Sequence, residues 1–164
     1  MNTIRRAMMA IVLGATLGSL AACSDAGGGG GDALPRAGAA ANVTVSNARV
    51  VMAPVAGNPA AVYLDLSYAG AAPVTLTGVT VEGAGMTMIH DYAESAGKMQ
   101  MTMAGPITLT EGIPVTFAPG GLHVMAMEPS DALTAGSTAK VTLTLSDGSG
   151  ISVDAPVRAA GEER

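Results

Sequence analysis

Alternation of apolar and polar residues, interrupted at short intervals by turn residues, extends through most of this chain. It is clearest at residues 62–68, 113–117 and 141–146, where every second side chain is apolar. Because successive side chains of a strand point to opposite faces, each run predicts a β-strand with one buried face. No stretch of the sequence shows a sustained helical period.

Turn signals rich in glycine and proline separate these runs. They are Gly57-Asn58-Pro59, Gly70 to Pro73, Pro119-Gly120-Gly121 and Asp147-Gly148. About eight or nine short strands over about 115 residues predict an antiparallel, two-sheet β-sandwich, which we place at residues 42–158. With one Phe, three Tyr and no Trp in the chain, the expected core is aliphatic.

The N-terminus has the pattern of a secretory signal over residues 1–22. Arg5 and Arg6 form a short basic region, and the apolar run at 7–20 is too short for an ordinary membrane span. The sequence Leu20-Ala21-Ala22-Cys23 resembles a bacterial lipobox, in which the cysteine is lipidated and begins the mature protein. We therefore expect a periplasmic lipoprotein of the bacterial cell envelope, anchored to the membrane through Cys23.

Cysteine count and charge exclude several classes of function. Cys23 is the only cysteine, so the folded part has no disulfide, no thiolate ligand and no cysteine nucleophile. Of 8 Lys and Arg residues, Arg5 and Arg6 leave with the leader, so 6 basic residues face 13 acidic ones. This balance argues against nucleic acid as a partner and leaves the acyl chains to hold the protein at the membrane.

The two ends of the mature chain predict no packed structure. Residues 23–41 contain five consecutive glycines and mostly small or polar residues, which is typical of a flexible tether. Residues 159–164 are expected to form a disordered tail.

Methionine and histidine gather in one part of the chain. Seven of the eleven methionines lie in the same window as both histidines: Met86, Met88, His90, Met99, Met101, Met103, His123, Met125 and Met127. On strands they form three groups at alternate positions, within 86–90, 99–103 and 123–127, so each group shares one face of its strand. Three strand faces thus offer soft sulfur, and two also offer imidazole.

This donor set fits copper(I) best. Thioether is a soft donor that selects copper(I), whereas zinc prefers cysteine, histidine or carboxylate, and blue copper sites require a thiolate. Calcium needs clustered carboxylates, but Asp91, Glu94, Glu111 and Glu128 are widely spread. With two histidines, no usable cysteine and no recognisable nucleophile–base arrangement, we do not expect an enzyme.

Packing is the competing interpretation of the methionines, because methionine is a flexible filler of cores. We expect Met86, Met88 and Met103 in the core or behind the ligands, and we leave open whether Met99 and Met127 line the site. The corresponding alternative function is a lipid-anchored sandwich that acts as a binding module without metal.

The spacing of four of these residues resembles the signature of the periplasmic copper chaperones of the PCuAC family. That signature is a histidine, ten residues, a methionine, twenty-one residues and then His-X-Met. His90, Met101 and His123-Val124-Met125 match every spacing. The flanking segments that also resemble the family are 60–64, 97–101 and 119–127.

The resemblance implies a cupredoxin-like, Greek-key β-sandwich that binds one copper(I) through His90, Met101, His123 and Met125. It further implies a copper chaperone that delivers its ion to a cuproprotein, the CuA centre of cytochrome c oxidase, through subunit II or its assembly factors. Copper storage or resistance is the alternative. Because imidazole must be neutral to ligate, we expect copper to be lost as the pH falls through the histidine range.

This chain differs from the family pattern in two ways. Some members carry a C-terminal tail rich in His and Met that takes copper(II), whereas residues 158–164 contain neither residue, so we infer no such site. Many members are soluble, whereas this chain is expected to be anchored by a lipid.

Overall fold

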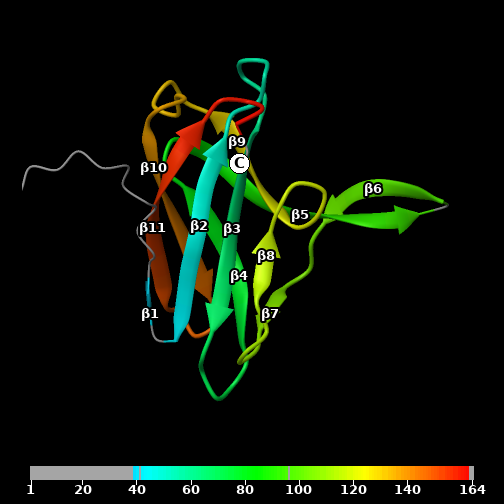
Figure 1. Ribbon diagram of the computed structural model, residues 1–164, viewed down its shortest axis with the longest axis vertical. Helices are drawn as coiled ribbons and strands as arrows, with labels where there is room; N and C mark the ends of the chain where they lie inside the picture. Colours follow the sequence, from blue (N-terminus) through cyan, green and yellow to red (C-terminus); the bar gives the residue numbers. More distant parts are fainter. Residues whose placement is uncertain (1–38, 41, 96, 163–164) are drawn as a thin grey trace, which may run out of the picture. The chain divides into compact units, whose positions relative to one another are not determined.

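The computed structural model describes residues 39–40, 42–95 and 97–162, and every regular element among them is a β-strand (Figure 1). The expected leader, Cys23 and the tether before Ala39 lie outside these residues. Across the described part of the chain, no helix is both long and apolar enough to cross a membrane.

The described residues form eleven strands. The first six are β1 (Ala39–Ala40), β2 (Val43–Val51), β3 (Ala60–Tyr68), β4 (Val74–Val81), β5 (Ala84–Ser95) and β6 (Lys98–Met103). The other five are β7 (Ile107–Leu109), β8 (Val115–Phe117), β9 (His123–Pro129), β10 (Thr138–Leu145) and β11 (Gly150–Arg158). β1, at the end of the segment expected as a tether, pairs with the beginning of β2. Beyond β11, the amide of Ala159 donates to the carboxylate of Glu162 at 3.1 Å, within a turn.

Hydrogen bonds join the strands in the order β6-β5-β9-β3-β2-β11-β10-β4-β7, with β8 added to β3. β2, β3 and β9 belong to one layer and β4, β10 and β11 to the other (Figure 1), and their inward side chains form one hydrophobic core. The predicted all-β sandwich is therefore confirmed. One pair differs from the antiparallel expectation, since β11 runs parallel to β2, with Val157 opposite Val50.

The core is aliphatic, as the composition predicts. Val62, Leu64 and Leu66 of β3 are each at most 1% exposed, and Phe117 of β8 is the largest fully buried side chain among the described residues. Removing one such side chain from water stabilises the fold by roughly 1.5–3 kcal/mol. The alternation at 62–68 therefore identifies the buried face of β3 correctly.

The strand expected at 113–117 begins later than the sequence indicates. Ile113 is 59% exposed and lies outside β8. Gly112 has a left-handed φ of 72°, and Pro114 has no N–H to donate to a neighbouring strand. A turn therefore occupies the expected start of the strand, and only Val115 and Phe117 keep the alternation.

β5 and β6 form a hairpin that extends away from the rest of the sandwich (Figure 1). Its turn includes Gly97, whose φ of 75° lies in the left-handed region that favours glycine. The first half of β5 pairs with β9, and Ile89 packs against the core. The second half of β5 pairs with β6, so the methionines of β6 lie outside the two layers of the sandwich.

Candidate metal centre

The histidine and methionine groups of β5, β6 and β9 lie on a single sheet face. β9 pairs with β5 through Met86↔Met127, Met88↔Met125 and His90↔His123. β6 pairs with the other edge of β5 through His90↔Met103, Tyr92↔Met101 and Glu94↔Met99. Because directly paired residues share a face, the three expected groups form one surface. We call the two histidines and seven methionines of this surface the imidazole–thioether face.

The two imidazoles meet at the centre of this face. The ring centroids of His90 and His123 are 5.9 Å apart, and their planes lie at 75° to each other. Tyr92, the next residue on the same face of β5, stacks on His123 at 5.6 Å with an interplanar angle of 27°. His123 is only 5% exposed, although its neighbour Val124 is the residue that faces the hydrophobic core. The structure thus brings together the two histidines expected as ligands.

A backbone hydrogen bond fixes the orientation and tautomer of His123. Its Nδ1 lies 2.8 Å from the carbonyl oxygen of Gly121. A carbonyl oxygen can only accept, so Nδ1 carries the proton and donates it. In the neutral ring, Nε2 then holds the lone pair. A backbone carbonyl on one nitrogen of an imidazole is the usual support for metal ligation through the other nitrogen.

His90 has a polar atom without a hydrogen-bond partner. Its Nδ1 is buried and makes no hydrogen bond to any of the described residues. Leaving a buried polar atom unsatisfied costs about 1–3 kcal/mol. A metal ion bonded to this nitrogen would remove the cost, so the buried Nδ1 of His90 fits a ligand role.

The two methionines expected as ligands lie on opposite sides of the imidazole pair. Met125 is half-buried and adjoins His123 on the same face of β9. Met101 is 45% exposed and pairs with Tyr92 on the hairpin. The residue directly opposite His90 on β6 is Met103 instead. The register therefore places a third thioether beside the imidazoles.

The comparisons with known proteins agree with this arrangement of strands. The family model described as "Putative lipoprotein LpqE-like" matches residues 43–157. The chain belongs to the LpqE-like family. A relative from Leifsonia xyli subsp. xyli, "Putative lipoprotein Lxx21020", is 32% identical over 100 residues, and the match spans 60% of each of the two chains.

Solved structures similar to this LpqE-like chain are PCuAC domains. "Copper-bound PCuAC domain from PmoF2" has a TM-score of 0.63 at 22% identity, covering 76% of this chain and 98% of that one. "Solution structure of CuI-DR1885 from Deinococcus radiodurans" has a TM-score of 0.57 at 29% identity, covering 71% and 78%. The resemblance to the PCuAC family and the cupredoxin-like β-sandwich predicted from the sequence are therefore confirmed.

The methionines of the imidazole–thioether face do not fill the core of this LpqE-like protein. None of the buried core side chains of the described residues is a methionine. Met86 is 48% exposed and Met103 is 68% exposed, and Met88 is half-buried without packing against the core. Of the two places expected for these three residues, the core is wrong, because they share the outward face with His90 while Ile89 takes the inward one. A place behind the ligands stays a prediction.

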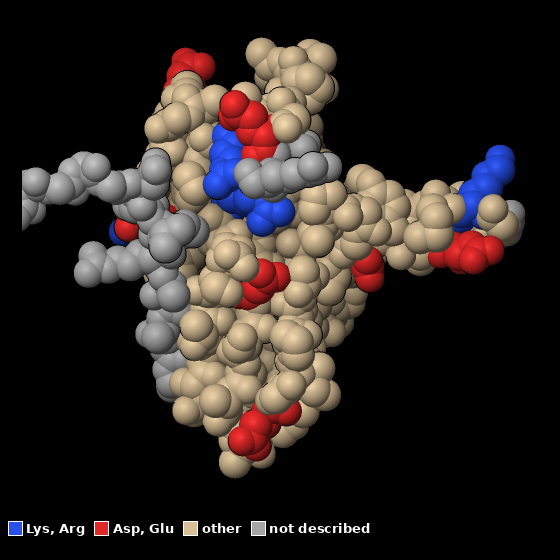
Figure 2. Space-filling view, viewed as in Figure 1, with Lys and Arg blue, Asp and Glu red and all other residues tan. Residues whose placement is uncertain are grey.

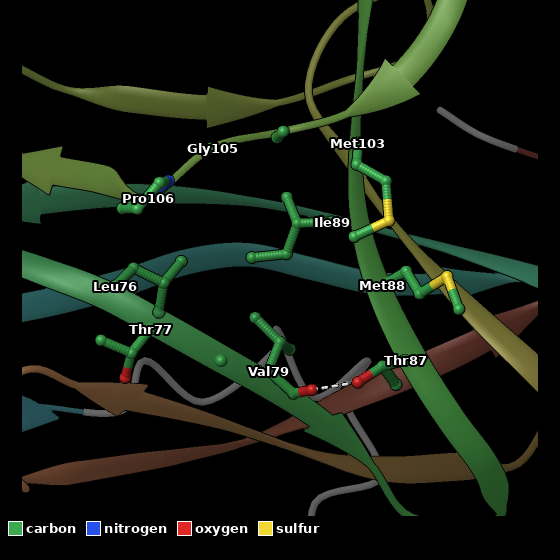
Figure 3. A pocket seen from close by; sticks show the side chains of 11 residues that line it. Leu76, Thr77, Val79, Thr87, Met88, Ile89, Met103, Gly105 and Pro106 are labelled. Carbon is green, nitrogen blue, oxygen red and sulfur yellow. Dashed lines mark hydrogen bonds between the residues drawn. The ribbon is translucent and has the colours of Figure 1, made fainter.

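Tyr92 contacts a histidine but is not among the residues that the sequence predicts for the site. It stacks on His123, and its position two residues after His90 is the available signal, since both occupy the same strand face. Met103, expected in the core or behind the ligands, lies opposite His90 on β6. In Figure 3 the sulfurs of Met88 and Met103 lie on one side of β5, and Thr87 and Ile89 lie on the other, beside a groove that all four line.

Charged side chains are sparse on the hairpin that carries this face. Figure 2 shows basic and acidic groups at the hairpin tip and few between the tip and the body. Within the described ranges, no group of three or more His, Cys, Asp and Glu residues is arranged to hold a metal ion. The donors nearest the centre of the imidazole–thioether face are two imidazoles and several thioethers, a set that favours a soft, monovalent cation. The carboxylate of Glu94 lies further out on the face, opposite Met99.

Proposed function

We propose that this LpqE-like protein binds one copper(I) ion through His90, Met101, His123 and Met125 and carries it in the cell envelope. The observation that supports the proposal most strongly is the imidazole pair, two rings 5.9 Å apart on a face that also carries seven methionines. The Nε2 lone pair of His123 and the unpartnered Nδ1 of His90 are available to a metal. The copper(I) state named for the Deinococcus radiodurans protein supports the same cargo.

The donor set suits a carrier rather than a catalyst. Imidazole and thioether are both neutral when they ligate, so the ion keeps its positive charge and gains no thiolate bond. Met101 is 45% exposed on a hairpin, so an incoming ligand from an acceptor can replace it from the solvent side. Transfer by ligand exchange to a thiolate-rich acceptor needs no change of oxidation state and no catalytic base.

The location and acceptor form the second part of the proposal. We infer a periplasmic lipoprotein, with Cys23 carrying the lipid and the copper acceptor lying in the same envelope. The expected acceptor is the CuA centre of cytochrome c oxidase, reached through its subunit II or an assembly factor. The family description as a lipoprotein supports the anchor, and the motif resemblance supports the acceptor.

Competition for copper(I) with a chromophoric chelator, under anaerobic reducing conditions, tests the binding site. The variant H123A/M125A should lose the most tightly bound equivalent of copper(I). The control Met52→Leu, directly after β2 and outside the imidazole–thioether face, should keep it. Binding that is unchanged in the double variant would favour the metal-free binding module instead. Circular dichroism of each variant confirms that the β fold is retained.

Delivery is tested in cells. A deletion strain grown with limiting copper should show reduced oxidase activity and reduced CuA content, which the wild-type gene restores and the H123A/M125A gene does not. Normal CuA assembly in the deletion strain, combined with sensitivity to excess copper, would contradict delivery and support storage or resistance.

A further inference from the structure

Five methionines of the imidazole–thioether face belong neither to the four-ligand set nor to the core. Three of them, Met86, Met88 and Met127, lie on β5 and β9. Met86 is 48% exposed, and the other two are half-buried without packing against the core. Burial therefore does not explain why three long, soft side chains gather here, at the end of the face away from the hairpin tip.

The register brings these three side chains together. Met86 is directly opposite Met127, and Met88 follows on the same face of β5. Opposed residues of an antiparallel pair have Cβ atoms about 4.5–5.5 Å apart, and residues two apart on a strand are about 7 Å apart. Methionine has three rotatable bonds beyond Cα, so the three sulfurs can reach a common point.

Two members of the cluster lie away from the histidine pair, and the third adjoins it. Met86 and Met127 are each four residues from the histidine of their own strand, which is about 13 Å on an extended strand. Met88 is two residues before His90 and is paired with Met125. The carboxylate of Glu128, next in sequence to Met127, lies close to Gly85, and Gly85 faces the opposite side of β5 from Met86. The face that carries the three methionines is therefore not the one on which the carboxylate of Glu128 lies.

We propose that Met86, Met88 and Met127 form a second copper(I) site, built from thioethers alone. Three soft, neutral donors select copper(I) over copper(II) and zinc. The site lies beside Met125 of the first centre, because Met88 and Met125 are directly paired. An ion held there would be bound without imidazole and more weakly than at the histidine pair. Such a site would hold copper before it enters the tighter site or after it leaves it.

Counting copper(I) equivalents tests this second site. Under anaerobic reducing conditions the wild-type protein should bind two equivalents, and the variant M86L/M88L/M127L should bind one. Leucine conserves much of the volume of methionine, and the three positions lie outside the core, so the fold should persist. The matched control is Met99→Leu, a methionine of the same face that is 62% exposed, which should keep both equivalents.

A histidine variant separates this inference from the proposed function. The H90A/H123A protein should keep one equivalent, with X-ray absorption that shows sulfur neighbours and no imidazole scattering. Two equivalents retained in M86L/M88L/M127L, or only one bound by the wild type, would overturn the second site. If H90A/H123A instead binds two equivalents, the proposed histidine site fails, while the methionine variant still decides the thioether site.

Discussion

The two faces of β5 and β9 carry different kinds of side chain. On the inward face, Val124 and Ala126 are fully buried and Ile89 packs against the core. On the outward face, the same strands carry both histidines and four methionines. Neighbouring residues in the chain therefore have different roles: the inward set packs the sandwich together, and the outward set gathers the imidazole and thioether donors.

The difference between the faces indicates which substitutions each face tolerates. Core positions stabilise the fold through burial and close packing, so the stability depends on the volume and polarity of their side chains. Outward positions supply donor atoms that backbone pairing holds in place, so metal binding depends on which donor atoms they carry. Substitutions on the outward face should therefore change copper(I) binding and leave the stability of the fold largely intact.

The largest expected effect comes from breaking the inward face. Val124→Asp places a carboxylate at a fully buried position and should lower the free energy of unfolding by about 4 kcal/mol or more. Met86→Asp, on the outward face of the paired strand, should change it by about 0.5 kcal/mol or less. Urea denaturation followed by circular dichroism measures both. Similar losses in the two variants would contradict the division between the faces.

A smaller effect is expected from the support of His123. Tyr92→Ala removes the ring that stacks on this imidazole and should weaken copper(I) binding about 10–100-fold, as loss of a neighbouring support does in other metal sites. Tyr92→Phe keeps the ring and should bind nearly as well as the wild type. An equal loss in both variants would mean that the hydroxyl matters and the stack does not. Chelator competition gives the affinities.

The smallest effect compares the local stability of the β5–β6 hairpin with that of the rest of the sandwich. Gly97 has a φ of 75°, so Gly97→Ala should destabilise the hairpin by about 1–2 kcal/mol. Amide hydrogen exchange in the second half of β5 and in β6 should accelerate, while β2 and β3 stay protected. Gly78→Ala is the control, because a Cβ there would meet nothing within 4 Å. Equal acceleration in both variants would contradict the role of the turn.

The sequence predicts the strand faces correctly but not their assembly. Parity alone places Met86, Met88 and His90 together, and the pairing confirms it. That His90 lies opposite His123 is a matter of register between distant strands, which depends on the global fold and not on local alternation. The motif spacing predicts that the two histidines share a site only because it resembles the signature of the PCuAC family.

Burial of the methionines could not be predicted for a related reason. Both faces of β5 are apolar, with Met86 and Met88 on one and Ile89 on the other, so alternation does not say which faces the core. Packing against β4 and β9 decides it in favour of Ile89. Tyr92 is not a soft donor, so the donor pattern does not indicate it. Its contact with His123 depends on the register between β5 and β9.

The most direct test of the central claim is X-ray absorption spectroscopy of the full-length protein loaded with one equivalent of copper(I). We predict imidazole scattering from His90 and His123 together with thioether sulfur from Met101 and Met125, and loss of the imidazole component in H90A/H123A. A first equivalent surrounded by sulfur alone, or by nitrogen and oxygen without sulfur, would contradict the claim that the paired imidazoles and their neighbouring thioethers form the primary copper site.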